Sequence, residues 1–190
     1  MTDHAWQSFL DRIAWEGSVH VGCDKLDAPL DPESRTRLEE LNRGVLATLG
    51  LLGERSAGDA SADEAAAATL ARLDAKVDAL LEMFNRHLAA SMQMPPRRPV
   101  HFNQRGILIE QWKPGDPEGA VLVRMHFDAC VGLPLELPGR AAPAPDGRGG
   151  FVAFDELADS VREGIEHLVF RQHRRQVAEA RRESRLGRPR

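Results

Sequence analysis

The chain has 190 residues and a mass of 21.0 kDa, enough for one domain with an insertion or for two small domains. Hydrophobic residues make up 42% of the sequence and charged residues 28%, the proportions of a soluble globular protein. The formal net charge of −4 argues against a surface that binds nucleic acid all over, and no stretch is apolar enough to predict a membrane span. We therefore expect a cytoplasmic protein without a signal peptide, in which the two isolated cysteines, Cys23 and Cys130, need no disulfide.

The N-terminal segment, residues 1–30, is predicted to form a short helix followed by one strand. Trp6, Phe9, Leu10 and Ile13 recur at the three- and four-residue spacing of one helix face. Residues 18–22 then alternate between polar and apolar side chains, which is the period of a strand with one buried face. The composition that follows is typical of a turn and ends this strand.

A helix is predicted to begin at Asp31, because a capping side chain is followed there by a proline and a glutamate. Apolar residues then recur at helical spacing to about Leu52, and Gly53 is a stop signal. Residues 53–62 have the composition of a polar link. A second helix is predicted over residues 63–90, which contain neither glycine nor proline, and Pro95 and Pro96 prevent its continuation.

The second helix carries a broad apolar stripe that fits a heptad frame. Leucine, valine and phenylalanine side chains fall on adjoining positions of that frame, and the candidate interface residues are Leu70, Leu73, Val77, Leu80, Leu81, Phe84 and Leu88. The stripe either packs on the first helix as an antiparallel hairpin or self-associates as a coiled coil. Its width favours self-association, and its departure from the β-branched pattern of dimers favours a homotetramer over a dimer. The frame spans little more than two heptads, so the hairpin remains an alternative.

Beyond Pro96 the sequence changes to short runs of strand-like alternation. Strands are predicted at residues 100–102, 106–111, 120–127, 133–137 and 151–154. Residues 141–150 are rich in proline and glycine and predict a loop. Asp155 can cap a C-terminal helix with a regular apolar face. Several short antiparallel strands closed by a terminal helix predict an α+β fold, a small antiparallel β-barrel with a C-terminal helix and two further helices.

The segment from His101 to Gly106 reads His-Phe-Asn-Gln-Arg-Gly and lies at a break between two predicted strands. It resembles the Asp/Asn-x-Ser-x-x-Gly segment of PilZ domains, which are small β-barrel receptors for cyclic di-GMP. The glycine is kept, whereas His101 and Asn103 replace the two polar residues. By this resemblance, the candidate nucleotide-binding residues are His101, Asn103, Arg105 and Gly106.

The resemblance covers about residues 97–178 and extends to the last strand and exit helix of the family, here residues 151–154 and 165–175. It implies a barrel of about six strands, in which residues 1–30 provide the N-terminal helix and the first strand. Residues 31–95 would then be a helical insertion for oligomerisation, residues 96–178 the barrel and exit helix, and residues 179–190 a basic tail.

Ligand-binding PilZ domains also carry an Arg-x-x-x-Arg segment ahead of the barrel, whose guanidinium groups bind phosphate and stack on bases. Here that spacing occurs at Arg171 and Arg175, and again ten residues later, both in or after the C-terminal helix. Arg12 has the spacing but is matched with Glu16, a carboxylate that repels phosphate. Both ligand motifs are therefore degraded, and we expect weak or no direct binding of cyclic di-GMP and no other cofactor.

Sequence signals for catalysis are weak. The chain lacks a phosphate-binding Gly-x-x-x-x-Gly-Lys-Ser/Thr segment and a Gly-x-Ser-x-Gly turn. His126, Asp128 and Cys130 alternate along one predicted strand, but metal sites usually show short paired spacings in two places. From Arg171 onward the sequence contains eight arginines and two glutamates. This charge run predicts a solvated helix end or, as the alternative, a surface for an anionic partner.

The resemblance implies a non-enzymatic signalling or adaptor protein in bacterial cyclic di-GMP, type IV pilus or motility regulation. We expect it to act as a homo-oligomer on protein partners. One alternative is a true cyclic di-GMP receptor with a diverged site. The other is a helical scaffold whose basic tail binds nucleic acid.

Overall fold

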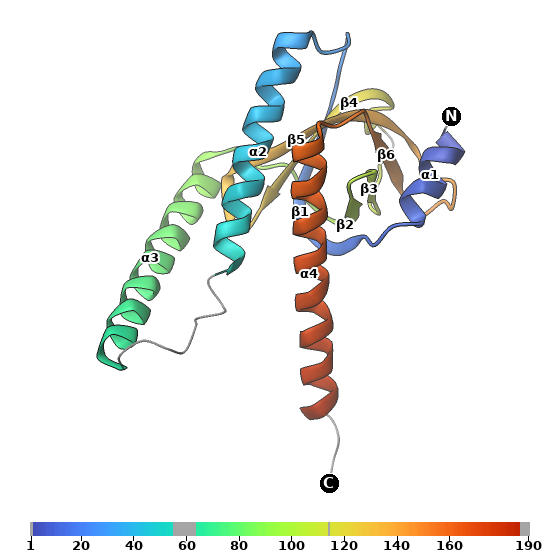
Figure 1. Ribbon diagram of the computed structural model, residues 1–190. Helices are drawn as coiled ribbons and strands as arrows, with labels where there is room; N and C mark the ends of the chain where they lie inside the picture. The colour runs from blue at the N-terminus through green and yellow to red at the C-terminus, as the bar shows by residue number, and fades with distance from the viewer. Residues whose placement is uncertain (1, 55–63, 114, 187–190) are drawn as a thin grey trace.

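Six antiparallel strands close into a barrel in the order β1-β2-β3-β6-β5-β4 (Figure 1). In this computed structural model the backbone is described for residues 2–54, 64–113 and 115–186, and side chains for residues 4–52, 69, 71–113 and 115–178. The strands are β1 Trp15–Lys25, β2 Arg97–Asn103, β3 Gly106–Ile109, β4 Gly119–Phe127, β5 Cys130–Pro143 and β6 Gly150–Phe154. The described helices are α1 Thr2–Leu10, α2 Pro32–Glu54, α3 Glu64–Ser91 and α4 Asp159–Leu186. The predicted α+β class, with a small antiparallel barrel and a C-terminal helix, is confirmed.

Strand alternation builds the barrel core as the sequence predicts. Val100 and Phe102 on β2 and Ile107 and Ile109 on β3 are all buried, with at most 1% of each residue exposed. Leu108, also buried on β3, points to the other side and packs with α1. A smaller apolar cluster of Trp6, Phe9, Leu108, Ala144 and Phe151 therefore holds α1 against the outside of the barrel.

Two helices, α2 and α4, lie side by side against the barrel (Figure 1). Their apolar residues belong to the same core cluster as the strands, among them Val45, Leu49, Ile165 and Leu168. Gly164 lets the helices come close, since a Cβ atom there would lie 2.9 Å from Leu46 Cδ1. The first predicted helix thus contributes to the barrel core, while the division of the chain into 1–30, 31–95, 96–178 and 179–190 stays a prediction.

The start of α2 has the predicted capping geometry. Asp31 Oδ1 accepts a hydrogen bond of 3.0 Å from the Ser34 amide, and the Asp31 carbonyl accepts one of 2.9 Å from Arg35. Pro32 occupies the first helical position, where its missing N–H is not needed. This signal is local in sequence, which is why it could be recognised without the fold.

Two boundaries in the C-terminal half differ from the sequence prediction. Asp155 does not cap α4, because it lies four residues before the first helical residue; its amide donates to the Pro138 carbonyl and extends the pairing of β6 with β5. The helix begins at Asp159, with a first bond from Arg162 to the Ala158 carbonyl. Strand β5 likewise runs on to Pro143, into the segment predicted as a loop, since it pairs with β6 over that length.

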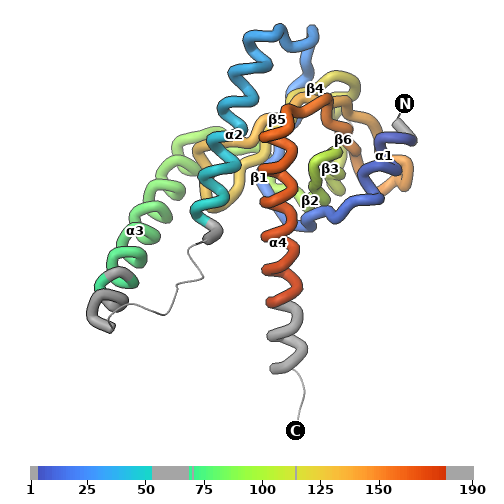
Figure 2. The backbone as a smooth tube through the Cα atoms, viewed as in Figure 1, coloured from blue at the N-terminus to red at the C-terminus, as the bar shows by residue number. Residues whose placement is uncertain are grey.

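Helix α3 leaves the barrel near β5 and diverges from α2 rather than lying along it (Figure 2). Leu73, Leu80 and Phe84 on its apolar face are 58%, 65% and 59% exposed. Packing of this face against α2 in an antiparallel hairpin, the first of the two sequence alternatives, is therefore not the arrangement found. Val45, Leu46 and Leu49 of α2 are buried in the core with the barrel and α4, and among the described residues no helix packs along α3.

Candidate functional site

The β2–β3 turn holds the segment that carries the family resemblance. Asn103 ends β2 and is fully buried, and its Oδ1 accepts a hydrogen bond of 2.8 Å from the Arg105 amide. Its Nδ2 donates 3.0 Å to the carbonyl of Phe9, at the end of α1. Both polar atoms of Asn103 are thus used to shape the turn and to fix α1 on the barrel.

Gly106 begins β3 opposite Ala153 of β6. A Cβ atom at this position would lie 2.5 Å from the Val152 carbonyl oxygen and 2.7 Å from the ring of Phe151. Gly106 is not among the positive-φ residues of the described chain. Its requirement is steric, because only a residue without a side chain allows β3 and β6 to approach.

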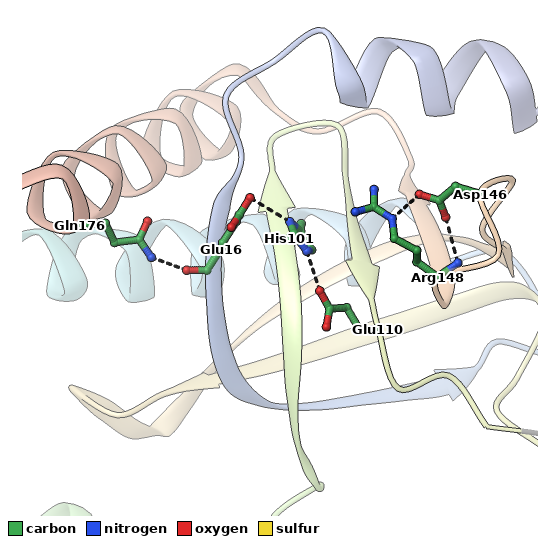
Figure 3. Close-up of polar contacts among 6 residues, drawn as sticks. All are labelled: Glu16, His101, Glu110, Asp146, Arg148 and Gln176. Carbon is green, nitrogen blue, oxygen red and sulfur yellow. Dashed lines mark hydrogen bonds and ion pairs between the residues drawn. The ribbon is translucent and has the colours of Figure 1, made fainter. Parts of the chain in front are cut away.

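His101 lies on the outside of β2 between two carboxylates (Figure 3). Its Nε2 is 2.8 Å from Glu110 Oε1, and its Nδ1 is 3.4 Å from Glu16 Oε1. Arg105 is exposed and has no hydrogen bond or ion pair through its side chain within the described residues. Of the predicted nucleotide-binding positions, His101, Asn103 and Gly106 have structural contacts, and only Arg105 has an unengaged side chain within the described residues. The carboxylates beside His101 disfavour the binding of phosphate there. Their role in nucleotide binding stays a prediction.

A cleft of about 420 Å³ adjoins this turn, between the α1–β1 connection and α4. Gln104 lines it and donates 3.0 Å from its Nε2 to Glu166 Oε1 on α4. Arg12 is the one arginine in its lining, which also includes Asp11 and Glu166. The cleft is thus not arranged as a paired-arginine site for two phosphates.

The two arginines at the start of β2 are already paired. Arg97 binds Asp128 through two hydrogen bonds of 2.8 and 2.6 Å, and Arg98 binds Asp116 through bonds of 2.7 and 3.1 Å. The Arg98–Asp116 pair is largely buried, with 11% and 17% of the side chains exposed. The Arg98 guanidinium holds the pKa of Asp116 below its ordinary value. These cations stabilise the barrel and are not free to bind a ligand.

The described residues offer little for covalent or metal chemistry. Burial raises the pKa of Cys23 to about 12, so its thiol is not a nucleophile near neutral pH. His126 Nδ1 lies 2.8 Å from the Val131 carbonyl, and Asp128 is bound to Arg97, so the alternating set with Cys130 does not converge. In the described part of the chain, no three His, Cys, Asp or Glu side chains are placed to hold a metal ion. Nor is any helix there both long and apolar enough to cross a membrane.

The apolar face of α3 is exposed along several turns of the helix. Besides Leu73, Leu80 and Phe84, it includes Val77, Leu81 and Leu88, which are half-buried, and Met83, which is 67% exposed. The side chain of Leu70, also predicted for the interface, lies outside the described residues. Exposed leucine and phenylalanine at heptad positions are typical of helices that associate, and the role of these residues as an interface stays a prediction.

Asn85 fixes the C-terminal part of α3 to the turn between β4 and β5. Its Nδ2 donates to the carbonyls of Asp128 and Ala129, and its Oδ1 accepts from the Val131 amide, each at 3.3 Å. Leu88 packs beside it, since a Cβ atom at Gly132 would lie 2.5 Å from Leu88 Cδ1. Sequence reasoning missed Asn85, because a single polar residue in a helix gives no sign of a partner 43 residues away.

A closed six-stranded barrel with a C-terminal helix packed into its core, and with a sterically required glycine after β2, defines a PilZ-type domain. The chain matches the family described as "Atypical PilZ domain, cyclic di-GMP receptor" over residues 46–182, and it belongs to this family. The match begins within α2 and therefore includes α3, so most of the predicted insertion lies within the matched region.

One solved structure similar to this chain is that of a pathogenic protein from Xanthomonas campestris. It is described as a tetrameric PilZ domain that self-assembles through an unusual helical bundle. The TM-score is 0.65 at 23% sequence identity, over 93% of this chain and 97% of the other. No curated protein matches the sequence.

Proposed function

We propose that the protein is a cytoplasmic, non-enzymatic adaptor of bacterial cyclic di-GMP signalling, in type IV pilus or motility control. It assembles as a homotetramer through α3 and acts on protein partners, with weak or no direct binding of cyclic di-GMP. The observation that carries this proposal is the exposed apolar face of α3, of which Leu73, Leu80 and Phe84 are each more than half exposed.

The assembly has support from the chain itself and from its neighbour. Apolar heptad residues that no helix of the same chain covers are stabilised when equivalent helices bury them. The Xanthomonas campestris protein is described as tetrameric through a helical bundle, which favours four copies over two. The barrel has a separate core formed with α2 and α4, so association through α3 requires no rearrangement of the barrel.

The weakness of nucleotide binding is supported by how the arginines are used. Arg97 and Arg98 are bound to Asp128 and Asp116, and two carboxylates flank His101. A dissociation constant near 1 μM requires about −8 kcal/mol of binding free energy. That value is hard to reach without several charge-assisted contacts to the two phosphates.

Calorimetric titration with cyclic di-GMP, combined with light scattering, tests both parts. We expect a tetramer and no saturable heat at micromolar nucleotide. Replacing His101 by aspartate and Asn103 by serine restores the family residues, yet it should not create binding, because the arginine pair is still missing. A 1:1 or 2:1 isotherm with wild type near 1 μM would overturn the proposal and favour the receptor with a diverged site.

A further inference from the structure

A second cleft, of about 300 Å³, lies between β1, the C-terminal half of α2, the β4–β5 turn and α4. It is distinct from the cleft beside Gln104, with which it shares no lining residue. Its volume falls at the lower end of the range for small-molecule sites. Its side chains divide into an apolar part and a cationic part.

The apolar part contains a fixed aromatic surface. The rings of Trp15 and Phe127 lie 5.8 Å apart at 36°, and Leu49 and Leu168 continue this surface. The Trp15 ring also covers Gly17, where a Cβ atom would lie 2.2 Å from the ring. Because Trp15 packs against both Gly17 and Phe127, its ring is in place before any ligand arrives, which lowers the entropy cost of binding.

The cationic part is formed by Arg171 and Arg175, four residues apart and therefore on one face of α4. Arg171 Nη1 donates 2.8 Å to the Gly50 carbonyl, a neutral partner that leaves its charge uncompensated. Arg175 is exposed and has no hydrogen bond or ion pair among the described residues.

The acidic residue in the lining does not neutralise these arginines. Asp128 is already bound through both oxygens to Arg97, which also donates 3.0 Å to the Ser18 carbonyl. The cleft and its edge thus carry three guanidinium groups against one carboxylate, an excess of two positive charges. Such an excess in a concave, partly apolar site attracts anions.

We propose that this cleft binds a small organic anion, with a flat apolar body on Trp15 and Phe127 and a phosphate or carboxylate between Arg171 and Arg175. Guanidinium groups bind either anion through paired N–H donors, whereas the aromatic surface selects against an inorganic ion. Gln172 also lines the cleft and supplies a further polar group. The cleft has no lining residue in α3 or in the β2–β3 turn.

The test uses full-length protein labelled with 5-fluorotryptophan, which gives one ¹⁹F signal for each of its three tryptophans. Replacing Trp15 by phenylalanine assigns the relevant signal. The probes are phenyl phosphate, benzoate, inorganic phosphate and neutral benzyl alcohol. We expect a saturable shift of the Trp15 signal with phenyl phosphate or benzoate, and the stronger of the two identifies the anionic group. Inorganic phosphate and benzyl alcohol should bind at least about tenfold more weakly, since each satisfies half of the site.

Arg175→Gln is the decisive variant, because Arg175 has no partner among the described residues whose loss would disturb the fold. It should raise the dissociation constant of the better probe at least about tenfold. Arg174→Gln is the matched control: it removes the same charge from the neighbouring residue, which lies over the Phe170 ring instead. Its dissociation constant should stay within about twofold of wild type. No saturable shift up to about 10 mM of either organic probe, or equal weakening by both variants, would overturn the proposal.

Discussion

Placing two aspartates on the apolar face of α3 should convert the assembly to monomers while the barrel stays folded. The variant carries Val77→Asp together with Leu80→Asp, at adjoining heptad positions near the middle of the helix. Leu80 is 65% exposed in the single chain, so its apolar surface is available for contacts between copies. The barrel core is formed by the strands with α2 and α4, and none of the described side chains of α3 belongs to it.

The expected magnitude follows from these exposures. Completely burying a leucine or phenylalanine is worth about 1.5–3 kcal/mol, so covering the exposed parts of Leu73, Leu80 and Phe84 contributes roughly 3–6 kcal/mol per chain. Association costs about 4–15 kcal/mol, so the net free energy that remains to hold the copies together is small. Replacing Leu80 by aspartate removes the burial energy of the leucine side chain. It also leaves a carboxylate in the interface, at a further cost of about 3 kcal/mol. A loss of about 4 kcal/mol per chain weakens association roughly a thousandfold.

Light scattering after size-exclusion chromatography measures the mass, and circular dichroism measures the retained β-sheet. The control variant carries Ala75→Asp and Ala79→Asp, which adds the same charge at exposed positions off the heptad stripe of α3. It should remain a tetramer, although aspartate is the poorer helix former at both alanines. A wild-type protein that is already monomeric at about 100 μM, well above the dissociation constant of an obligate interface, would contradict association through α3.

Three further predictions concern the barrel. Asn103→Ala leaves the Phe9 carbonyl and the Arg105 amide without their partner, so we expect urea titration to show a loss of about 2 kcal/mol in the free energy of unfolding. Because Arg98 lowers the pKa of folded Asp116, their pair stabilises the fold above the ordinary value of 3.8 and loses this contribution as the pH falls below it. Asp116→Asn should therefore lower the thermal unfolding midpoint near neutral pH, and the difference from wild type should vanish in strong acid. Burial raises the pKa of Cys23 to about 12, so mass spectrometry should show Cys23 alkylated by iodoacetamide at mildly alkaline pH only after denaturation.

The sequence predicted those features that depend on neighbours along the chain. Alternation placed Val100 and Phe102 inside the barrel, and the Asp31-Pro32 pair marked the start of α2, because both signals are complete within a few residues. The start of α4 was wrong for the opposite reason. Asp155 has the side chain of a cap, but its amide is held by Pro138 of β5, and that contact exists only in the folded barrel.

In the candidate site, too, the sequence predicts some residues, while their partners are brought together only by the fold. Gly106 was recognised from its motif, yet its reason is the approach of β6, a strand that follows it by more than forty residues. The carboxylates that flank His101 come from β1 and from the end of β3, so the residues next to His101 in the sequence do not predict them. The capture of Arg97 and Arg98 by acidic partners is equally a consequence of the closed barrel. Binding residues could thus be proposed from the motif, whereas their partners could not.

Because α3 is attached to the barrel through Asn85, near its C-terminal end, a rotation at this attachment moves the N-terminal end of the helix most. At 1.5 Å per residue, about 32 Å of helix separates Asn85 from Glu64 at the far end. A rotation of about 5° at the β4–β5 turn would therefore displace that end by about 3 Å, most of the width of a side-chain contact. Phe127, Asp128 and Ala129 of this turn also line the cleft that contains Arg171 and Arg175. Any molecule that shifts the turn would thus change the angle between the barrel and α3. The resulting displacement would be largest at the far end of α3, where the helices of different copies would meet.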